Sequence, residues 1–279
     1  MSPERHLVHR TGAFPLGRRV LVMGIVNVTP DSFSDGGRHF ATDAAIAAAR
    51  TMAREGADIL DIGGESTRPG HVVVPPAKEW GRVAPVLAEL AGTGDVPPIS
   101  IDTWKADVAR RALAAGASIV NVVWGFQRDP EIAAVTAESG AAAILMHNRD
   151  AIDASIDIVD DILRFLERSL GIARRAGVAE DRIVLDPGIG FGKSYAQSFR
   201  ALAALPRFRA LGFPVLLGLS RKGFIGGLTE PAAPSSERLG GTIAGNVHGA
   251  LAGADIIRVH DVAPHVQAMR MIETVKAAA

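Results

Sequence analysis

The sequence predicts an α/β protein built as a single-domain (β/α)8 TIM barrel. Short runs rich in Val, Ile and Leu alternate eight times with longer Ala-rich runs between residues 20 and 278. No linker-like or low-complexity stretch divides these units, so we assign residues 1–18 to an N-terminal extension and residues 19–279 to the barrel. The main alternative is a doubly wound open sheet, but no G-x-G-x-x-G motif opens the first helix.

Each predicted strand is a short apolar run that is long enough to be buried on both faces, as in a parallel sheet. The first run changes abruptly into Asn, Thr, Pro, Asp, Ser and Gly, which are residues of turns and ligand-binding loops. We expect the eight strands at residues 20–28, 58–62, 98–102, 118–123, 142–147, 183–186, 214–218 and 255–260.

The predicted helices carry the usual boundary signals. Pro75 and Pro76 open the second helix, while Gly56 and Gly116 close the first and the third. We expect helices at about residues 42–55, 75–91, 105–115, 130–139, 155–176, 195–210, 237–252 and 263–278.

Composition excludes several classes of protein. Lys plus Arg equals Asp plus Glu at 30 each, and a net charge of zero argues against nucleic-acid binding. The absence of Cys excludes disulfides and thiolate chemistry. Residues 1–10 have no apolar signal core, and no later run approaches the roughly 20 apolar residues of a membrane span. We therefore expect a soluble cytoplasmic protein that acts on small molecules, without a nucleic-acid or membrane partner.

Polar residues collect at the expected carboxyl ends of the strands, where the active face of such a barrel lies. Polar residues with a structural role should instead scatter between both ends of the barrel. The one-sided distribution therefore indicates an enzyme. The set comprises Asn27, Asp61, Glu65, Asp102, Asn121, His147, Asp186, Ser220, Arg221, Lys222, Arg258, His260 and Asp261.

Two carboxylates and one amide of this set suit a flat heterocycle with several N–H donors. Asp102, Asn121 and Asp186 could read a 2-amino-4-oxo-pyrimidine ring through directional hydrogen bonds. The alternative for Asp102 is that it caps the following helix, because Asp is a common N-cap residue.

Cationic side chains at the same end suit an anionic group of a substrate, most simply a phosphate or diphosphate. The alternative is that they are solvated or paired with neighbouring acids, which applies most to Arg221 and least to Arg258 and His260. The full cationic set is Arg68, Arg221, Lys222, Arg258 and His260.

The glycine-rich loop 187–193 lacks the G-x-x-x-x-G-K-[ST] spacing of a nucleotide phosphate loop. Phe191 within it could offer its ring to a flat substrate. Asn27 could hold a hard cation such as Mg²⁺, which often takes only one or two protein ligands. His147 has no second His or Cys at ligand spacing, so we expect a buried, hydrogen-bonded histidine and no zinc site.

Seven stretches together resemble the dihydropteroate synthase family, and they occur in the same order. The first two, residues 21–37 and 63–70, resemble the two signature segments of that family. The resemblance extends from about residue 19 to residue 274. The other five stretches are residues 100–103, 145–149, 185–193, 220–222 and 257–262.

The resemblance implies a homodimeric enzyme of folate synthesis that uses Mg²⁺. Such an enzyme joins 4-aminobenzoate to (7,8-dihydropterin-6-yl)methyl diphosphate and releases dihydropteroate and diphosphate. Loops 29–40 and 64–75 would close over the site and exclude water.

The resemblance also implies roles for individual residues. The pterin-binding residues would be Asp102, Asn121, Asp186 and Lys222. The diphosphate-binding residues would be Asn27, Arg68, Arg258 and His260, with the metal at Asn27. The aminobenzoate-binding residues would be Phe33, Thr67, Arg68, Pro69, Phe191 and Gly223. The catalytic residues would be Asp35, Asp186 and Lys222.

Two positions depart from the family pattern. The family usually has Asn-Asp at the end of the fourth strand, where this chain has Asn121-Val122, and the lost carboxylate could weaken orientation of the pterin site. The family often has Ser where this chain has Gly223, which could alter affinity for aminobenzoate or sulfonamides. Val122 motivates one alternative, a pterin-binding paralogue that has lost turnover. Another is a methyltetrahydrofolate-binding methyltransferase domain, which uses no diphosphate and does not explain the cationic set.

Overall fold

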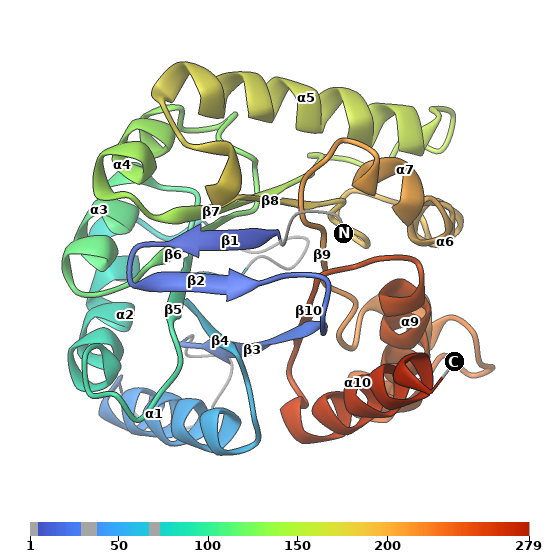
Figure 1. Cartoon of the computed structure of the whole chain (residues 1–279), viewed down its shortest axis with the longest axis horizontal. Helices are drawn as coiled ribbons and strands as arrows, with labels where there is room; N and C mark the ends of the chain where they lie inside the picture. Colours follow the sequence, from blue (N-terminus) through green and yellow to red (C-terminus); the bar gives the residue numbers. More distant parts are fainter. Residues whose placement is uncertain (1–4, 29–37, 67–72, 279) are drawn as a thin grey trace.

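Eight parallel strands, each followed by helical structure, form the barrel that the sequence predicts (Figure 1). The computed structural model describes residues 5–28, 38–66 and 73–278. The sheet order is β8-β7-β6-β5-β4-β3-β10-β9, so each strand lies beside its neighbour in the chain. A parallel bridge from Leu185 to Val215 connects β8 to the start of the β9 region and closes the barrel.

Every predicted strand is present, and most are shorter than the apolar run that predicted them. The reason is that the backbone leaves the hydrogen-bonded ladder before the buried run ends. The barrel strands are β3 (Leu21–Asn27), β4 (Ile59–Gly63), β5 (Ile99–Asp102), β6 (Ile119–Val122), β7 (Ala142–Met146), β8 (Ile183–Asp186), β9 (Leu216–Leu217) and β10 (Ile256–Val259).

The helices surround the barrel (Figure 1). The helix predicted over residues 195–210 is in fact two helices, because Pro206 lacks the N–H that would continue the first of them. The helices are α1 (Arg38–Arg54), α2 (Pro76–Leu90), α3 (Ala106–Ala114), α4 (Glu131–Ser139), α5 (Ile158–Ala176), α6 (Tyr195–Ala203), α7 (Leu205–Arg209), α8 (Gly223–Gly226), α9 (Leu239–Leu251) and α10 (Val262–Ala277). In the described part of the chain, no helix combines the length and apolar character needed to cross a membrane.

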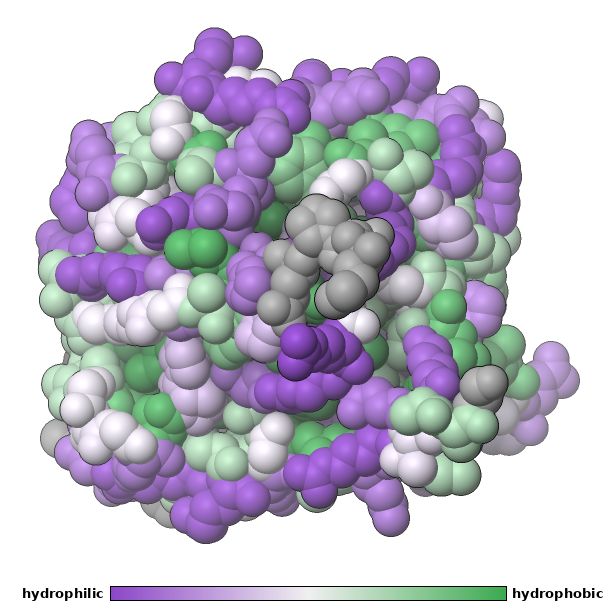
Figure 2. All heavy atoms as spheres, in the orientation of Figure 1, coloured by the Kyte–Doolittle hydropathy of each residue, from purple (hydrophilic) through white to green (hydrophobic). Residues whose placement is uncertain are grey.

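Side chains alternate along each strand between the barrel interior and the layer between strands and helices. In β3, Leu21 and Met23 belong to the interior cluster, whereas Val22 and Val26 pack in the outer layer beneath the helices. In Figure 2, hydrophilic residues lie around much of the outer edge of the molecule, and apolar residues lie between them. The outer layer is the main hydrophobic core. The interior cluster fills the lower half of the barrel, toward the amino-terminal ends of the strands.

A β-hairpin that the sequence did not predict closes the amino-terminal end of the barrel. Strands β1 (His6–His9) and β2 (Gly12–Pro15) pair antiparallel and lie across the barrel (Figure 1). Leu7 and Leu16 are buried in the same interior cluster as the lower barrel residues. Arg5 Nη2 lies 2.9 Å from Asp255 Oδ1, and this ion pair connects the start of the hairpin to the residue before β10. The hairpin is therefore a floor for the barrel core.

We expect Leu7→Ala to lower the free energy of unfolding by about 2–5 kcal/mol, because it leaves a cavity in a closed apolar cluster. Urea denaturation would measure the loss, and the matched control is Ala13→Ser on the exposed part of β2. Equal midpoints for the two variants would show that the hairpin does not contribute to the core.

Candidate active site

Polar residues form a row at the mouth of the barrel. Asn27, Asp102 and Asp186 are the last residues of β3, β5 and β8. The strand register pairs Asn27 with Gly63, Gly63 with Asp102, and Asp102 with Asn121. A Cβ on Gly63 would lie 3.4 Å from the Cβ of Asp102, which is an ordinary packing distance. The predicted gathering of polar residues at the carboxyl ends is present in the structure.

A guanidinium lies between two carboxylates inside this mouth. Arg258, from β10, donates from Nε to Asp61 Oδ2 at 2.6 Å and from Nη2 to Asp102 Oδ2 at 2.8 Å. Its side chain is only 18% exposed. Asn121 Nδ2 also donates to Asp61 Oδ2, at 2.9 Å. From the sequence, pairing with neighbouring acids was the less favoured alternative for Arg258. The structure shows that Arg258 is nevertheless paired with two acids.

Asp102 does not cap the next helix. The residue before α3 is Lys105, and no side chain caps the helix from that position. Instead, the carboxylate of Asp129 accepts a hydrogen bond of 2.8 Å from the backbone N–H of Ala106. The capping interpretation of Asp102 is wrong, and its carboxylate belongs to the mouth.

Three buried oxygens of this cluster have no hydrogen-bond partner among the described residues. They are Oδ1 of Asp61, of Asp102 and of Asn121. A buried polar atom without a partner costs about 1–3 kcal/mol, so native proteins rarely leave several together. All three atoms are acceptors. The mouth is therefore suited to a ligand that presents several N–H donors.

Burial moves the pKa values of three charged groups at the mouth toward neutral pH. It raises the pKa of Asp102 to about 7, against the opposing effect of Arg258. It also raises the pKa of Asp186, which Lys222 opposes. Burial lowers the pKa of Lys222 to about 7, although Asp186 favours its charged form. The protonation of the mouth is therefore sensitive to pH near 7.

The glycine-rich loop 187–193 forms one wall of the site. Asp186 Oδ1 accepts a hydrogen bond of 2.7 Å from the backbone N–H of Gly188. Lys222 Nζ donates to the carbonyl of Ile189 and lies 4.2 Å from the centre of the Phe191 ring. The structure thus brings Asp186, Lys222 and Phe191 together, as predicted.

Two other basic residues at the mouth have fixed partners. Arg221 donates from Nε to Asp261 Oδ2 at 2.9 Å, and Nη2 contacts the other carboxylate oxygen. The paired interpretation of Arg221 is therefore correct. The ring of His260 is oriented by a 2.8 Å contact from Nδ1 to the hydroxyl of Ser220.

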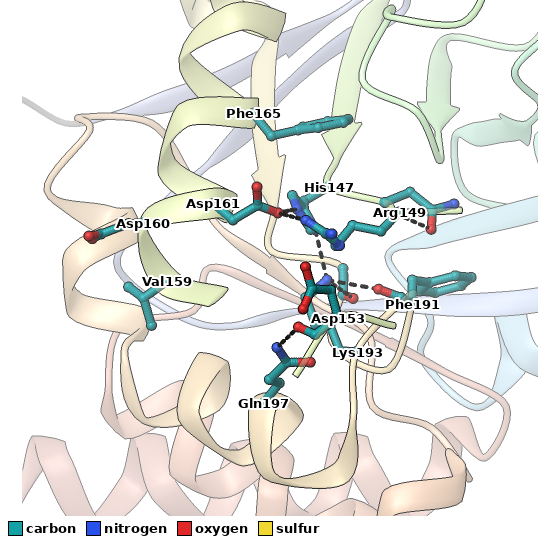
Figure 3. Close-up of polar contacts among 12 residues, drawn as sticks. His147, Arg149, Asp153, Val159, Asp160, Asp161, Phe165, Phe191, Lys193 and Gln197 are labelled. Atoms are coloured by element: carbon teal, nitrogen blue, oxygen red, sulfur yellow. Dashed lines mark hydrogen bonds and ion pairs between the residues drawn. The ribbon is translucent and has the colours of Figure 1, made fainter. Parts of the chain in front are cut away.

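His147 is a buried, hydrogen-bonded histidine, as expected. Its Nε2 lies 3.1 Å from Asp161 Oδ2, and its Nδ1 lies 2.7 Å from Lys193 Nζ (Figure 3). Burial lowers the pKa of the imidazole to about 3, so the ring is neutral. The described residues contain no group of three or more His, Cys, Asp or Glu side chains that could hold a metal.

Asn27 nevertheless fits a cation that arrives with its own ligands. The residue is half-buried at the end of β3. Its amide oxygen can serve as one ligand for a hard cation such as Mg²⁺, while phosphate oxygens and water supply the others.

Five predicted site residues lie outside the described residues: Phe33, Asp35, Thr67, Arg68 and Pro69. Most of the two predicted closing loops lies outside as well. A buried cluster that was not predicted from the sequence lies beside the second of these loops. Lys105 Nζ contacts carboxylate oxygens of both Glu65 and Glu79, and Glu65 Oε1 accepts from the backbone N–H of Val74 at 3.3 Å. Only the tertiary fold brings these three side chains together.

The two departures from the family pattern have different surroundings. Val122 is 1% exposed and belongs to the outer layer beneath the helices, because side chains alternate after the inward-facing Asn121. Gly223 begins α8, and a side chain there would meet the hydroxyl of Tyr195 at 3.4 Å. Val122 thus lies behind the polar mouth, whereas Gly223 borders Lys222.

Comparison with known proteins agrees with this geometry. A model of the pterin binding enzyme family matches residues 23–260. The dihydropteroate synthase of Clostridium beijerinckii is 44% identical over 263 residues, which cover 94% of this chain and 96% of the relative. That of Bacillus subtilis is 45% identical over 271 residues, which cover 97% and 94%.

Solved structures give the same result. Xanthomonas albilineans dihydropteroate synthase with 4-aminobenzoic acid superposes with a TM-score of 0.93 at 43% identity, covering 98% of this chain and 99% of the other. The same enzyme in complex with 7,8-dihydropteroate gives a TM-score of 0.85 at 42% identity, covering 94% and 96%. The chain therefore belongs to the pterin-binding enzyme family, within its dihydropteroate synthase branch.

Proposed function

We infer that the chain condenses (7,8-dihydropterin-6-yl)methyl diphosphate with 4-aminobenzoate to give 7,8-dihydropteroate and diphosphate. The observation that carries this conclusion is the group of three unpartnered buried acceptors on Asp61, Asp102 and Asn121. A dihydropterin ring offers amino and ring N–H donors along one edge, which such acceptors would bind. The solved relatives that hold 4-aminobenzoic acid and 7,8-dihydropteroate support the same substrates for this chain.

We assign the pterin ring to Asp102, Asn121, Asp186 and Lys222. Arg258 would connect this subsite with the diphosphate, because its guanidinium already bonds Asp102 and is partly exposed at the mouth. The diphosphate would lie toward Asn27, His260 and Arg68. Phe191 and Gly223 would border the aminobenzoate, together with Phe33, Thr67 and Pro69.

The reaction exchanges one bond at the pterin methylene carbon. The carbon–oxygen bond to diphosphate breaks, and the diphosphate leaves with the electron pair. The neutral aromatic amine then forms the carbon–nitrogen bond and loses one proton. The carboxylate of Asp186, with Asp35, would favour the positive charge that develops on the pterin. Lys222 would hold the ring and its neighbouring loop in place.

Mg²⁺ held at Asn27 would supply charge neutralisation for the departing diphosphate. His260, Arg258 and Arg68 would do the same from the protein.

A homodimer remains part of the proposal. Large apolar side chains are exposed on the outer helices α9 and α10, and a second copy could cover them. These side chains are Leu251, Met271 and Val275.

The direct test is release of diphosphate by the purified protein with Mg²⁺ and both substrates. We expect release that depends on 4-aminobenzoate and on Mg²⁺, and a Lys222→Met variant with at least about tenfold lower turnover, because a charged hydrogen bond is worth about 1.5–3 kcal/mol. No release from the unmodified protein would refute the function. Tight pterin binding without release would instead indicate the paralogue that lacks turnover.

We expect pterin affinity to be highest near pH 7, from the opposite titrations of Asp102 and Lys222. Below about pH 7, Asp102 gains a proton and loses an acceptor, and above it Lys222 loses a proton and a donor. Asp102→Asn should weaken binding and reduce the acid limb only, which calorimetric titration of a pterin from pH 5.5 to 8.5 would measure. Burial raises the pKa of Asp186 as well, so its protonation can leave a smaller acid limb. An acid limb of unchanged size in the variant would contradict the assignment of Asp102.

Val122→Asp should lower stability without improving pterin binding. The carboxylate would enter the apolar layer beneath the helices, at a cost of roughly 3 kcal/mol or more. Urea denaturation and pterin titration measure the two effects, with Val122→Thr as the isosteric control. A gain in affinity or turnover would mean that the missing carboxylate limits the natural protein.

A further inference from the structure

A buried lysine behind the glycine-rich loop has no role in the reaction described above. Lys193 is 4% exposed. Its Nζ lies 2.7 Å from the carbonyl oxygen of Gly188, 3.0 Å from that of Phe191 and 2.7 Å from Nδ1 of His147 (Figure 3). An ammonium group has three N–H donors, and these three acceptors match them. Lys193 therefore ties two carbonyls of one loop to the end of another strand.

The hydrogen bonds continue from the lysine to the surface of the protein. Because Nδ1 of His147 accepts from Lys193, the neutral ring carries its proton on Nε2 and donates to Asp161. Arg149 also donates to Asp161, at 2.8 Å (Figure 3). Within the described residues, no carboxylate contacts Lys193 Nζ directly. Burial lowers the pKa of Lys193 well below its usual range, whereas Asp186 and Asp161 favour the charged ammonium.

The clamped loop is pressed closely against the segment after β7. Gly188 and Gly192 have φ values of +60° and +57°, in the left-handed region that favours glycine. A side chain on Gly188 would collide with the carbonyl of His147, and one on Gly192 would collide with Arg149. The backbone of the loop therefore lies against residues 147–149, with Lys193 as its hydrogen-bonding anchor.

The opposite side of the same loop belongs to the substrate site. Ile189 accepts a hydrogen bond from Lys222, and the Phe191 ring lies 4.2 Å from Lys222 Nζ. The carbonyl of Phe191 is itself one of the acceptors of Lys193. One lysine therefore holds the backbone of Phe191 from behind, and another contacts its ring from the front.

We propose that Lys193 is a positioning residue for the aminobenzoate side of the site, acting through loop 187–193 and the ring of Phe191. The choice of aminobenzoate rests on the proposed function. Of the four residues assigned to the pterin, Asp102 and Asn121 stand on β5 and β6 and do not depend on the clamp. Asp186 and Lys222 contact the front of the loop at Gly188 and Ile189, so we expect pterin binding to change less than aminobenzoate binding, though not to be wholly independent of it. Loss of the ammonium would release two carbonyls and free the ring. Recognition of the second substrate would then suffer more than binding of the first.

The test is Lys193→Met, which keeps the length of the side chain and removes its donors. We expect the KM for 4-aminobenzoate to rise by about tenfold or more, as loss of charged hydrogen bonds predicts, while the Kd for pterin changes by less than about threefold. An unchanged KM in a folded variant would overturn the inference. Parallel losses in KM and pterin Kd would overturn it as well, because they indicate general damage.

A double-mutant cycle with Phe191→Leu tests whether the lysine acts through the ring. We expect Lys193→Met to raise KM far less in the Phe191→Leu background than in the natural chain. Additive effects would contradict the proposed route.

Should Lys193→Met fail to fold, Lys193→Gln keeps two N–H donors for the carbonyls, and we expect an intermediate rise in KM. A KM for Lys193→Gln equal to that of the natural chain would then overturn the inference.

Two controls separate this inference from the proposed function and from loss of stability. The unmodified protein must release diphosphate with both substrates; its failure would refute the function itself, independently of Lys193. Gln127→Met removes a side chain that bonds Phe165 and Ser169, each at 2.9 Å, away from the loop. It should lower stability without changing KM, and a KM shift equal to that of Lys193→Met would overturn the positioning role.

Discussion

The mouth of the barrel is organised by the guanidinium of Arg258 between Asp61 and Asp102. Burial of an unpaired carboxylate would cost several kcal/mol. Burial raises the pKa of Asp102, and the guanidinium of Arg258 opposes this shift. Asp61 also accepts from Asn121, and this contact orients the amide. One guanidinium therefore fixes, directly or through Asp61, the three buried acceptors that we assign to the pterin. Because the side chain of Arg258 is 18% exposed at the mouth, we propose that it also couples the proposed pterin subsite to the leaving group.

Around this centre the barrel is divided along its axis. The lower half is filled by apolar side chains and closed by the hairpin, whose Leu7 and Leu16 join the interior cluster. The upper half holds charged groups, which burial brings toward neutral pKa values. A rigid apolar floor allows the polar mouth to leave acceptors unpaired until a ligand supplies donors. Stability and binding are thus assigned to opposite ends of the same strands, as in other barrels of this class.

Much of the site was predictable because strand ends are visible in the sequence. Asp102 and Asp186 end their strands, and Asn121 and Arg258 lie one residue before the ends of theirs. Parallel strands deliver these ends to one face. The partners of these residues were not predictable. Asp61 and Arg258 are separated by 197 positions, and nothing local indicates that they touch. The clamp of Lys193 was missed for the same reason, since its acceptor His147 lies directly after another strand, β7. The hairpin was missed because its short strands gain their stability by packing Leu7 and Leu16 against the barrel interior.

The sequence alone determined the fold class, the order of the elements and the family, because hydrophobic periodicity and contiguous motifs are local properties. It also determined which residue types stand at the mouth. The tertiary structure decided how their charges are paired: Arg221 turns to Asp261, whereas Arg258 turns inward to Asp61 and Asp102. It also decided that Val122 faces the helix layer, behind Asn121. These outcomes depend on barrel closure and side-chain direction, which bring distant residues within hydrogen-bonding distance and which no local pattern encodes.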